Sequence, residues 1–430
     1  MKPAFPAEAR QERWALDADA RDPLAWCREG FELPVDAGGE PLLYLCGNSL
    51  GLMPREARSL VLGELDAWAR RGVEGHMDGP RPWYSYHEPL LAPMARLVGA
   101  HPAEIAVMNS LTVNLHLMLT SFYRPDPGRW KILMEESAFP SDTYAVTSHL
   151  ASRGLDPAEG LVLARPRAGE ALLRIEDIEQ LLARRGGEIA LVFLPGVQYF
   201  TGQLLDMWRI TRAAHAAGAL AGFDLAHAAG NAVLHLHEWE VDFAVWCSYK
   251  YLNAGPGAVA GCFVHQRLGS DPAIPRLAGW WGNDPATRFR MHLNERFVPV
   301  SGAAGWQLSN PPILSMAPLA ASLATFDRAG MPALREKSEQ LTGYLEFLVA
   351  GLDQGRIRQV TSTDSKERGC QLSFQVPERA RELFNELRRR GIVGDFRAPD
   401  MIRLSPVPLY NTFHELWRAG QALEELLRVP

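Results

Sequence analysis

The stretch CSYKYLNAGPG, residues 247–257, places a lysine just after an apolar run. The chain otherwise avoids this residue, because only five of its 44 basic residues are lysines. An amine that has lost its proton can attack a carbonyl group, whereas a guanidinium stays protonated. Lys250 is therefore a candidate for chemistry and not only for solubility.

Polar residues follow two other apolar runs in the same way. Asp224 and His227 stand in FDLAHAAGN, while Ser110 and Thr112 stand in MNSLTVNL at the start of a helical pattern. The first turn of a helix has free backbone N–H groups that favour an anion. An aldehyde cofactor with a pyridine ring and a phosphate needs these groups together. Lysine forms a Schiff base, a carboxylate keeps the ring nitrogen protonated, and the helix N-terminus binds the phosphate.

Each of these residues also has a simpler interpretation. A lysine after a strand is usually solvated, and Asp224 or Thr112 alone could cap a helix. His227 could be a buried histidine of the core. The order along the chain favours the cofactor interpretation, because Asp224 follows one apolar run and Lys250 follows the next.

Other chemistries find less support in the sequence. The segment GPGAVAG (255–261) fits neither GxGxxG nor the P-loop pattern. HLHEW (235–239) has two histidines but no HExxH, so we interpret them as structural and predict no metal site. The chain also lacks the GxSxG elbow of the α/β-hydrolases.

The elements that must position these residues alternate between strand and helix. Strands of four to eight apolar residues that alternate with longer helical patterns indicate βαβ units and a mostly parallel sheet, which binds ligands at the carboxyl ends of its strands. We predict strands at 104–109, 130–136, 160–166, 189–196, 220–226, 241–248 and 258–265, and helices at 111–123, 142–154, 176–186 and 208–218.

The pattern changes after residues 309–316. Two long helical patterns follow, and short strands then alternate with helices, which indicates a smaller α/β domain. We predict an N-terminal segment (1–60) that packs with this small domain, a large cofactor-binding domain (61–315) and the small C-terminal domain (316–430). Its predicted helices are 317–330, 332–352, 379–391 and 411–427, and its predicted strands are 370–376, 391–396 and 401–406.

Composition excludes several classes of protein. The net charge of -6 over 430 residues gives no basic surface for nucleic acid and no polybasic arm for a membrane. No apolar run approaches the roughly 20 residues that cross a bilayer. Five cysteines without a CxxC pair argue against a disulfide framework. Charges of both signs at the N-terminus are unlike a signal peptide, so we predict a cytoplasmic protein.

A set of longer motifs identifies a family. The sequence is similar to the kynureninases from about residue 44 to the C-terminus. The resemblance implies a hydrolase with pyridoxal 5'-phosphate as its cofactor and the aspartate-aminotransferase fold (fold type I), working as a homodimer with shared active sites. The matching motifs are GNSLG (47–51), RPW (81–83), LTVNLH (111–116), FPSD (139–142), GFDLAHAAGN (222–231), WCSYKYLN (246–253), GWWG (279–282), SNPPI (309–313), ERGCQL (367–372) and RLSPVPLYN (403–411).

The resemblance also implies residues that hold the cofactor. Lys250 matches the lysine that binds the aldehyde, Asp224 the carboxylate that faces the ring nitrogen, and His227 a neighbour of that carboxylate. Phe139 matches the aromatic residue that stacks on the ring. Further cofactor contacts are implied for Leu111, Thr112, Pro140, Ser141, Asp142, Tyr249, Asn310 and Trp280, the last from the partner subunit. Pro195 departs from relatives that carry a hydroxyl residue at that position.

The implied reaction is cleavage of the Cβ–Cγ bond of kynurenine or 3-hydroxykynurenine. The products are anthranilate or 3-hydroxyanthranilate and L-alanine. Arg403 matches the arginine that binds the substrate's α-carboxylate, and Tyr249 is a candidate proton carrier. Ser49, His76 and Asn310 match positions near the aromatic ring.

The polar groups of His76, Ser309 and Asn310 predict a preference for 3-hydroxykynurenine, which suits a route from tryptophan towards NAD.

Two alternatives remain open from the sequence. A cysteine desulfurase or a transaminase could share the fold, and a desulfurase needs an exposed thiol of low pKa. Cys370 is the candidate for that thiol in the small domain, although it opens an apolar strand. A non-catalytic protein could also use the fold as an interaction module, but such a protein would have no need for the lysine, the carboxylate and the arginine together.

Overall fold

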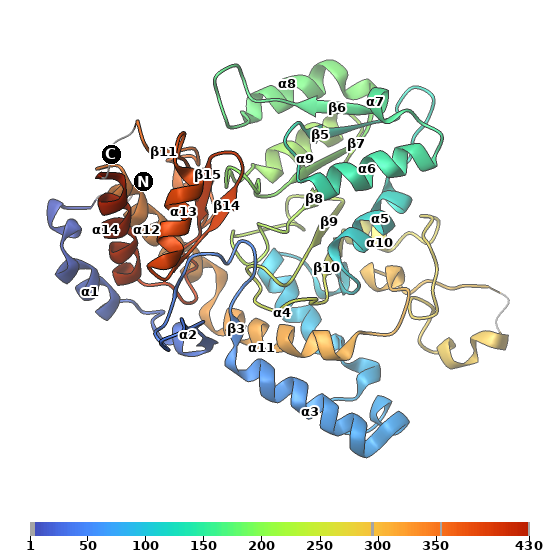
Figure 1. Cartoon of the computed structure of the whole chain (residues 1–430). Helices are drawn as coiled ribbons and strands as arrows, with labels where there is room; N and C mark the ends of the chain where they lie inside the picture. Colours follow the sequence, from blue (N-terminus) through green and yellow to red (C-terminus); the bar gives the residue numbers. More distant parts are fainter. Residues whose placement is uncertain (1–4, 294–295, 353–354, 429–430) are drawn as a thin grey trace.

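The computed structural model describes residues 5–293, 296–352 and 355–428. The chain folds around two separate sheets that stand side by side in Figure 1. The larger sheet is coloured from cyan to yellow, and the smaller one from orange to red.

The larger sheet has seven strands, and it is parallel except at one edge. The strand β10 is antiparallel to both of its neighbours, β4 and β9, whereas the remaining pairs are parallel. This confirms the predicted α/β class and the mostly parallel sheet. The order is β4 (Ile105–Val107), β10 (Gly261–Val264), β9 (Phe243–Trp246), β8 (Leu220–Asp224), β7 (Ile189–Pro195), β5 (Lys131–Glu135) and β6 (Leu161–Ala164).

Helices cover both faces of this sheet, which explains why its strands are apolar at nearly every position. Successive side chains of a strand point to opposite faces. Ile132 and Met134 pack with α5 (Leu111–Phe122) and α6 (Pro140–Ser152). Leu133 packs on the other face with α4 (Glu88–Val98), α8 (Ile175–Arg185) and α9 (Met207–Ala216).

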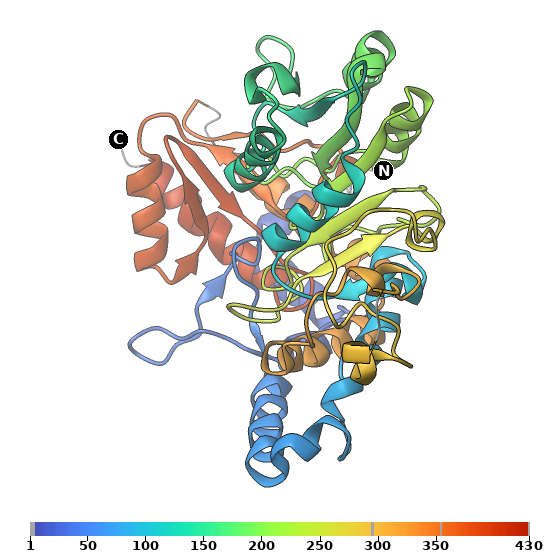
Figure 2. The ribbon, with the colours of Figure 1, turned by 90° about the vertical axis from the view of Figure 1, so that its right-hand side faces the viewer.

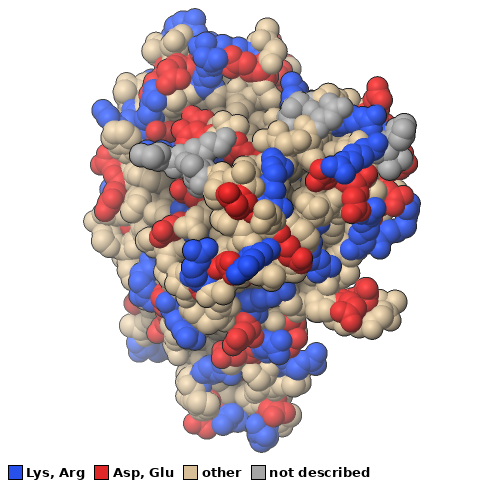
Figure 3. All heavy atoms as spheres, turned by 90° about the vertical axis from the view of Figure 1, so that its left-hand side faces the viewer, with Lys and Arg blue, Asp and Glu red and all other residues tan. Residues whose placement is uncertain are grey.

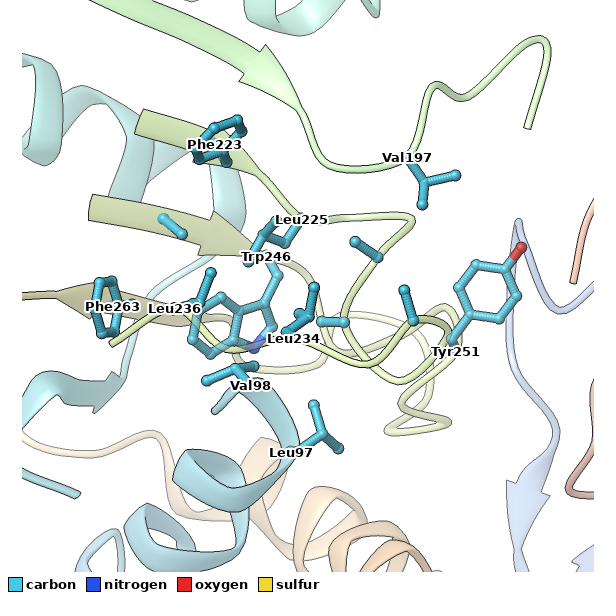
Figure 4. Close-up of a cluster of buried hydrophobic side chains, with 14 of the residues drawn as sticks. Leu97, Val98, Val197, Phe223, Leu225, Leu234, Leu236, Trp246, Tyr251 and Phe263 are labelled. Carbon is cyan, nitrogen blue, oxygen red and sulfur yellow. The ribbon is translucent and has the colours of Figure 1, made fainter. Parts of the chain in front are cut away.

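The register of the parallel strands brings three carboxyl ends together. Pro195 at the end of β7 lies opposite Asp224 at the end of β8, and Asp224 lies opposite Val245 in β9. A cluster of buried apolar side chains supports this region from below, as Figure 4 shows for Phe223, Leu225 and Trp246. The loops that follow these strands therefore begin at strand ends that are packed against the buried core.

The smaller sheet has four antiparallel strands and a core of its own. The predicted strand 391–396 divides into β13 (Ile392–Val393), which pairs with β2 (Leu43–Tyr44), and β14. The sheet order is β11 (Arg358–Gln359), β12 (Leu372–Gln375), β15 (Met401–Leu404) and β14 (Asp395–Arg397), and the helices of this region are α12 (Met331–Val349), α13 (Ala380–Arg389) and α14 (Phe413–Arg428).

Segments that precede the large sheet contact both parts of the molecule. Helix α1 (Glu12–Ala20) lies beside α14, and its Ala15 belongs to the core of the smaller sheet. Helix α3 (Arg55–Arg71) packs on α11 (Ile313–Ala329) at one end of the molecule (Figure 2). The remaining short elements are α2 (Trp26–Glu29), α7 (Pro157–Gly160), α10 (Gln266–Gly269), β1 (Phe31–Glu32) and β3 (Met53–Pro54).

The predicted division of the chain into an N-terminal segment, a large domain and a small domain remains a prediction. The predicted boundary at residue 315 falls inside α11, whose Met316 and Leu319 are buried in the core below the larger sheet. We therefore propose that the large domain includes α11 and that the small domain begins at α12.

Charged side chains of both signs are intermixed on the face of the molecule in Figure 3. Among the described residues, no helix combines the length and the apolarity that a bilayer crossing requires. The cytoplasmic location stays a prediction.

Candidate active site

The predicted cofactor residues surround one cavity of about 140 Å³ at the carboxyl ends of β5, β7 and β8. Nine of them line it together, and Pro195, Tyr199 and Glu135 complete much of the wall. The nine are Leu111, Thr112, Phe139, Ser141, Asp142, Asp224, His227, Tyr249 and Lys250.

Lys250 lies in the turn after β9, with its amine inside the cavity. Its Nζ is 3.0 Å from Nε2 of His227 and 5.8 Å from the ring centre of Phe139. Burial and the charge of Lys250 lower the pKa of His227 well below its ordinary value, so the imidazole is neutral at pH 7. A neutral imidazole can accept a hydrogen bond from the lysine ammonium.

The loop of the GNSLG motif fixes the backbone beside the lysine. The Gly51 N–H donates to the carbonyl oxygen of Tyr249 at 2.8 Å. A Cβ at Gly51 would stand 2.2 Å from the carbonyl oxygen of Lys250, so only glycine fits there. Burial raises the pKa of Tyr249, which keeps its phenol protonated at neutral pH.

Two carboxyl groups meet opposite the lysine. Oδ1 of Asp224 accepts a hydrogen bond from the backbone N–H of Ala226 at 2.6 Å. Burial, and then the adjacent charge of Asp224, raise the pKa of Asp142 well above its ordinary value. Asp142 therefore keeps its proton at neutral pH and can share it with the adjacent Asp224.

The first turns of two helices also line the cavity. Helix α5 begins at Leu111, and α6 begins at Pro140, whose ring sets the backbone angle that a first helical residue needs. The hydroxyl oxygens of Thr112 and Ser141 are 3.2 Å apart. Two helix N-termini and two hydroxyl groups at one place make a site for a phosphate.

These groups fit pyridoxal phosphate. Nδ1 of His227 and Oδ1 of Asp142 are buried and have no hydrogen-bond partner among the described residues, so a ligand can pair with them. Phe139 lies at the cavity with Tyr199 edge-on to it, at 5.2 Å between ring centres. Pro195 lines the cavity, and its side chain has no hydrogen-bonding group to offer a ligand there.

Arg403 in β15 belongs to a second charged cluster next to the cavity. Its side chain is 1% exposed, and its Nη1 donates to the backbone oxygen of Tyr199, a residue of the cavity wall, at 2.5 Å. Nε donates to Oδ1 of Asp395 at 3.2 Å. Nη2 lies 2.8 Å from Oδ2 of Asp395, yet it makes no well-aligned hydrogen bond with any described residue. Arg403 and Asp395 therefore form a close ion pair in which the Nη2 contact is poorly aligned, and a ligand carboxylate could compete for it.

Asp395 is a residue that the sequence analysis missed. It lies opposite Arg403 in the β14–β15 ladder, and it accepts a hydrogen bond from the Ser49 hydroxyl at 2.6 Å. Arg403 and its other partners hold the pKa of Asp395 below its ordinary value. An Asp and an Arg on adjacent predicted strands were the available signal, because a hairpin sets such residues opposite each other.

Six of the predicted site residues do not line the cavity of the single chain. Pro140 begins α6 next to it, and Ser49 and Arg403 belong to the adjacent cluster around Asp395.

The other three predicted residues lie farther along the surface of the chain. His76 is exposed, and its Nδ1 is 3.0 Å from the carbonyl oxygen of Val73. Trp280 is half-buried against Trp281. Asn310 is exposed just before α11.

The histidines of HLHEW contact a different part of the molecule. Nδ1 of His237 lies 2.9 Å from Oε1 of Glu104, and its ring is nearly parallel to that of His265. Glu104 also accepts hydrogen bonds from the backbone N–H groups of His101 and Gln266. Both carboxylate oxygens of Glu104 thus accept hydrogen bonds that link separate segments of the chain, which suits a structural role.

Cys370, the candidate thiol of a desulfurase, is buried. Burial raises its pKa to about 12. A thiol in this state is a poor nucleophile at neutral pH.

Known structures share this fold at low sequence identity. The cysteine desulfurase from Thermococcus onnurineus NA1 aligns over 100% of both chains with a TM-score of 0.73 and 18% identity. The cysteine desulfurase CsdA from Escherichia coli covers 94% of this chain and 98% of its own, with a TM-score of 0.74 and 17% identity. A C-DES variant with glycine covalently linked to its PLP cofactor has a TM-score of 0.72 and 20% identity over 93% of this chain and 99% of its own. These likenesses confirm the fold type I architecture.

Sequence relatives are much closer. Residues 334–423 match the kynureninase C-terminal domain family. Kynureninase from Myxococcus xanthus is 53% identical over 413 residues, which is 96% of each chain. Kynureninase from Salinispora tropica is 52% identical over 98% of each chain. The protein is therefore an enzyme of this type with pyridoxal phosphate as its cofactor, as the sequence motifs predicted. The chain belongs to the kynureninase family.

Proposed function

We propose that the enzyme cleaves the Cβ–Cγ bond of kynurenine and 3-hydroxykynurenine by hydrolysis. The products are anthranilate or 3-hydroxyanthranilate and L-alanine. The observation that carries the proposal is the joint placement of Lys250 and Asp224 in one cavity, with Arg403 hydrogen-bonded to its wall. Relatives named kynureninase at about half identity support it.

Each side chain has a role that follows from its position. Pyridoxal phosphate, when bound, supplies an aldehyde for the substrate amine and a cationic ring that withdraws electrons from the α-carbon. Lys250 would hold the aldehyde of the cofactor, and its amine could take the α-proton of the substrate. Asp224 would face the ring nitrogen and keep it protonated. Tyr249, whose phenol retains its proton, serves as a proton donor in the later steps.

Arg403 would hold the α-carboxylate of the substrate. Its Nη2 is buried without a well-aligned hydrogen bond, and a carboxylate can accept two parallel hydrogen bonds from a guanidinium. Asp395 already forms an ion pair with this arginine. Substrate binding therefore has to loosen the Asp395 contact, and Ser49 stays behind as the partner of Asp395.

The second subunit of a homodimer would complete the site. His76, Trp280 and Asn310 stay outside the cavity in the single chain, and they lie among exposed apolar side chains of the same segments. Val73 is 75% exposed, Met77 56% and Leu314 44%. Burial of such side chains favours association. We propose that pairing of two chains brings these three residues to the cavity of the partner.

We further propose a preference for 3-hydroxykynurenine. With the second subunit in place, His76 and Asn310 would offer hydrogen bonds to a hydroxyl group on the aryl ring, and Ser309 adds a third polar group nearby. Plain kynurenine would leave a buried polar group unpaired, which costs about 1–3 kcal/mol. This corresponds to a roughly tenfold to hundredfold difference in kcat/KM.

Incubation of the PLP-loaded protein with both substrates tests these proposals. Fluorescence of the aromatic products and an assay for alanine should show turnover of both, with the higher kcat/KM for 3-hydroxykynurenine. The double variant His76→Trp with Asn310→Thr should lose that preference. Equal kcat/KM values for the two substrates in the wild type would contradict the proposed preference. Sulfide release from cysteine without turnover of kynurenine would contradict the proposed reaction and indicate a desulfurase.

A further inference from the structure

Glu135 is a buried carboxyl group that the proposed reaction does not use. It ends β5 with 5% of its surface exposed. Its Oε1 lies 3.3 Å from Nε2 of Gln198. The orientation of this amide is fixed, because Oε1 of Gln198 accepts hydrogen bonds from the backbone N–H groups of Phe200 and Thr201. Gln198 therefore presents its N–H₂ group to Glu135.

Glu135 separates two cavities. The inner one is the cofactor cavity, and the outer one, of about 410 Å³, lies between the two sheets. Among the described residues, Glu135 alone lines both cavities. Glu135 therefore borders both the cofactor cavity and a separate, solvent-accessible space.

The charges around Glu135 differ on the two sides. On the inner side it faces Asp142 from α6, with Asp224 of β8 and Lys250 from the loop after β9 lining the same cavity. The outer cavity is lined by Glu136, Glu170, Arg358 and Asp400.

Three carboxyl groups thus share the inner cavity with one lysine. Burial raises the pKa of Glu135 to about 7, so the ligand-free protein holds a proton there over part of the neutral range.

We propose that Glu135 is the proton-exchange residue of the cofactor site and that cofactor binding drives its proton into the outer cavity. The O–H bond of the carboxylic acid breaks, its electron pair stays on the carboxylate, and the proton passes to water in the outer cavity. The cationic ring that binds beside Asp142 and Asp224 stabilises the new negative charge. This inference rests on the proposed placement of the cofactor ring.

Calorimetric titration of the cofactor-free protein with pyridoxal phosphate measures the proton release directly. Titrations at one pH in buffers of different ionisation enthalpy give the number of protons released on binding. Near pH 7 the wild type should release about half a proton more than Glu135→Gln, since half of its Glu135 is protonated before binding. The difference should vanish at pH 9, where Glu135 is ionised with and without the cofactor.

Glu136→Gln is the matched control. Glu136 is the next residue in the chain, but it is exposed, lines only the outer cavity and pairs with Arg165. On cofactor binding, the Glu136→Gln variant should release the same number of protons as the wild type.

If Glu135→Gln fails to fold or to bind, Glu135→Asp keeps a titratable group and should retain the release near pH 7. If Glu135→Asp binds the cofactor but no longer shows this proton release, the proposal is overturned.

Equal proton release in the wild type and Glu135→Gln, at full cofactor occupancy, also overturns the inference and leaves the cofactor site intact. A wild type that gains no absorption band from added cofactor would instead contradict the cofactor site itself.

Discussion

The cofactor cavity and the Arg403 cluster both bury charged groups, but they balance the charge in different ways. In the cavity, Asp142 and His227 each have a buried polar atom that finds no hydrogen-bond partner in the described part of the chain, and both have displaced pKa values. In the cluster, Arg403 is already paired with Asp395, which in turn holds the Ser49 hydroxyl. The cavity has polar groups that a charged ligand can satisfy. In the cluster, Arg403 must give up part of its contact with Asp395 before it can bind a ligand carboxylate.

This difference has an energetic meaning. A buried polar group without a partner costs about 1–3 kcal/mol, and a ligand that satisfies it recovers that free energy as affinity. An arginine with a partner in place gains less from a new one, because the old contact has to weaken first. The cavity is thus suited to a cofactor that stays bound, whereas the cluster is suited to a substrate that leaves after each turnover.

The largest expected effect comes from Lys250. Lys250→Ala removes the amine that binds the aldehyde and takes the α-proton, so turnover should fall by roughly 10⁴-fold or more. Borohydride reduction and peptide mapping of the wild type should place the cofactor on Lys250. Lys131→Ala is the control, because Lys131 lies at the opposite end of β5 and pairs with Glu188. A label on Lys131 would contradict the assignment.

The second largest effect is the difference in turnover between variants of Asp224 and Asp142, two carboxyl groups of the cavity. Asp224→Asn should bind the cofactor but lose several orders of magnitude in turnover, since an amide cannot keep the ring nitrogen protonated. Asp142→Asn should cost far less, because Asp142 is protonated in the folded protein and an amide also donates a hydrogen bond. Steady-state kinetics of both variants decide the order. Equal losses would show that the two carboxyl groups do not divide their roles in this way.

Arg403→Lys tests the second region with a smaller effect. A lysine keeps the charge but loses the two parallel hydrogen bonds to a carboxylate, so KM should rise by roughly tenfold to hundredfold at unchanged cofactor occupancy. Arg397→Lys is the matched control, since Arg397 also pairs with Asp395 but is partly exposed. If cofactor occupancy falls while KM stays constant, Arg403 is a phosphate or structural residue.

The smallest effect concerns pH and a buried histidine outside both regions. Burial lowers the pKa of His149 from 6.5 to about 4. As the pH falls below about 6.5, the unfolded chain takes up a proton that the folded chain refuses, so stability is lost on the acid side. His149→Gln should therefore lose less stability between pH 7.5 and 5 than the wild type, as urea unfolding at each pH measures. An identical loss in both proteins would assign the acid sensitivity to other groups, such as His227.

The strands of the large sheet and most of the helices that cover it were predictable because each has a clear apolar pattern. β7 is apolar throughout, since helices cover it on both sides, and α9 keeps one apolar face. The helices α3 and α4 were not predicted. The division of the strand at 391–396 was also missed. Gly394 lies between β13 and β14, which pair in different sheets, and a Cβ there would stand 2.7 Å from Cδ2 of Leu404.

The order of residues along the chain was enough to select Lys250, Asp224 and His227, because the ends of parallel strands meet at one edge of a sheet. The longer motifs then identified the family. The ion pair of Asp395 with Arg403, the place of Glu135 between two cavities and the proton on Asp142 depended on the tertiary structure. Contacts between distant segments decide which charged residues pair, and exclusion of water decides which carboxyl groups keep a proton. A local pattern of residues contains neither kind of information.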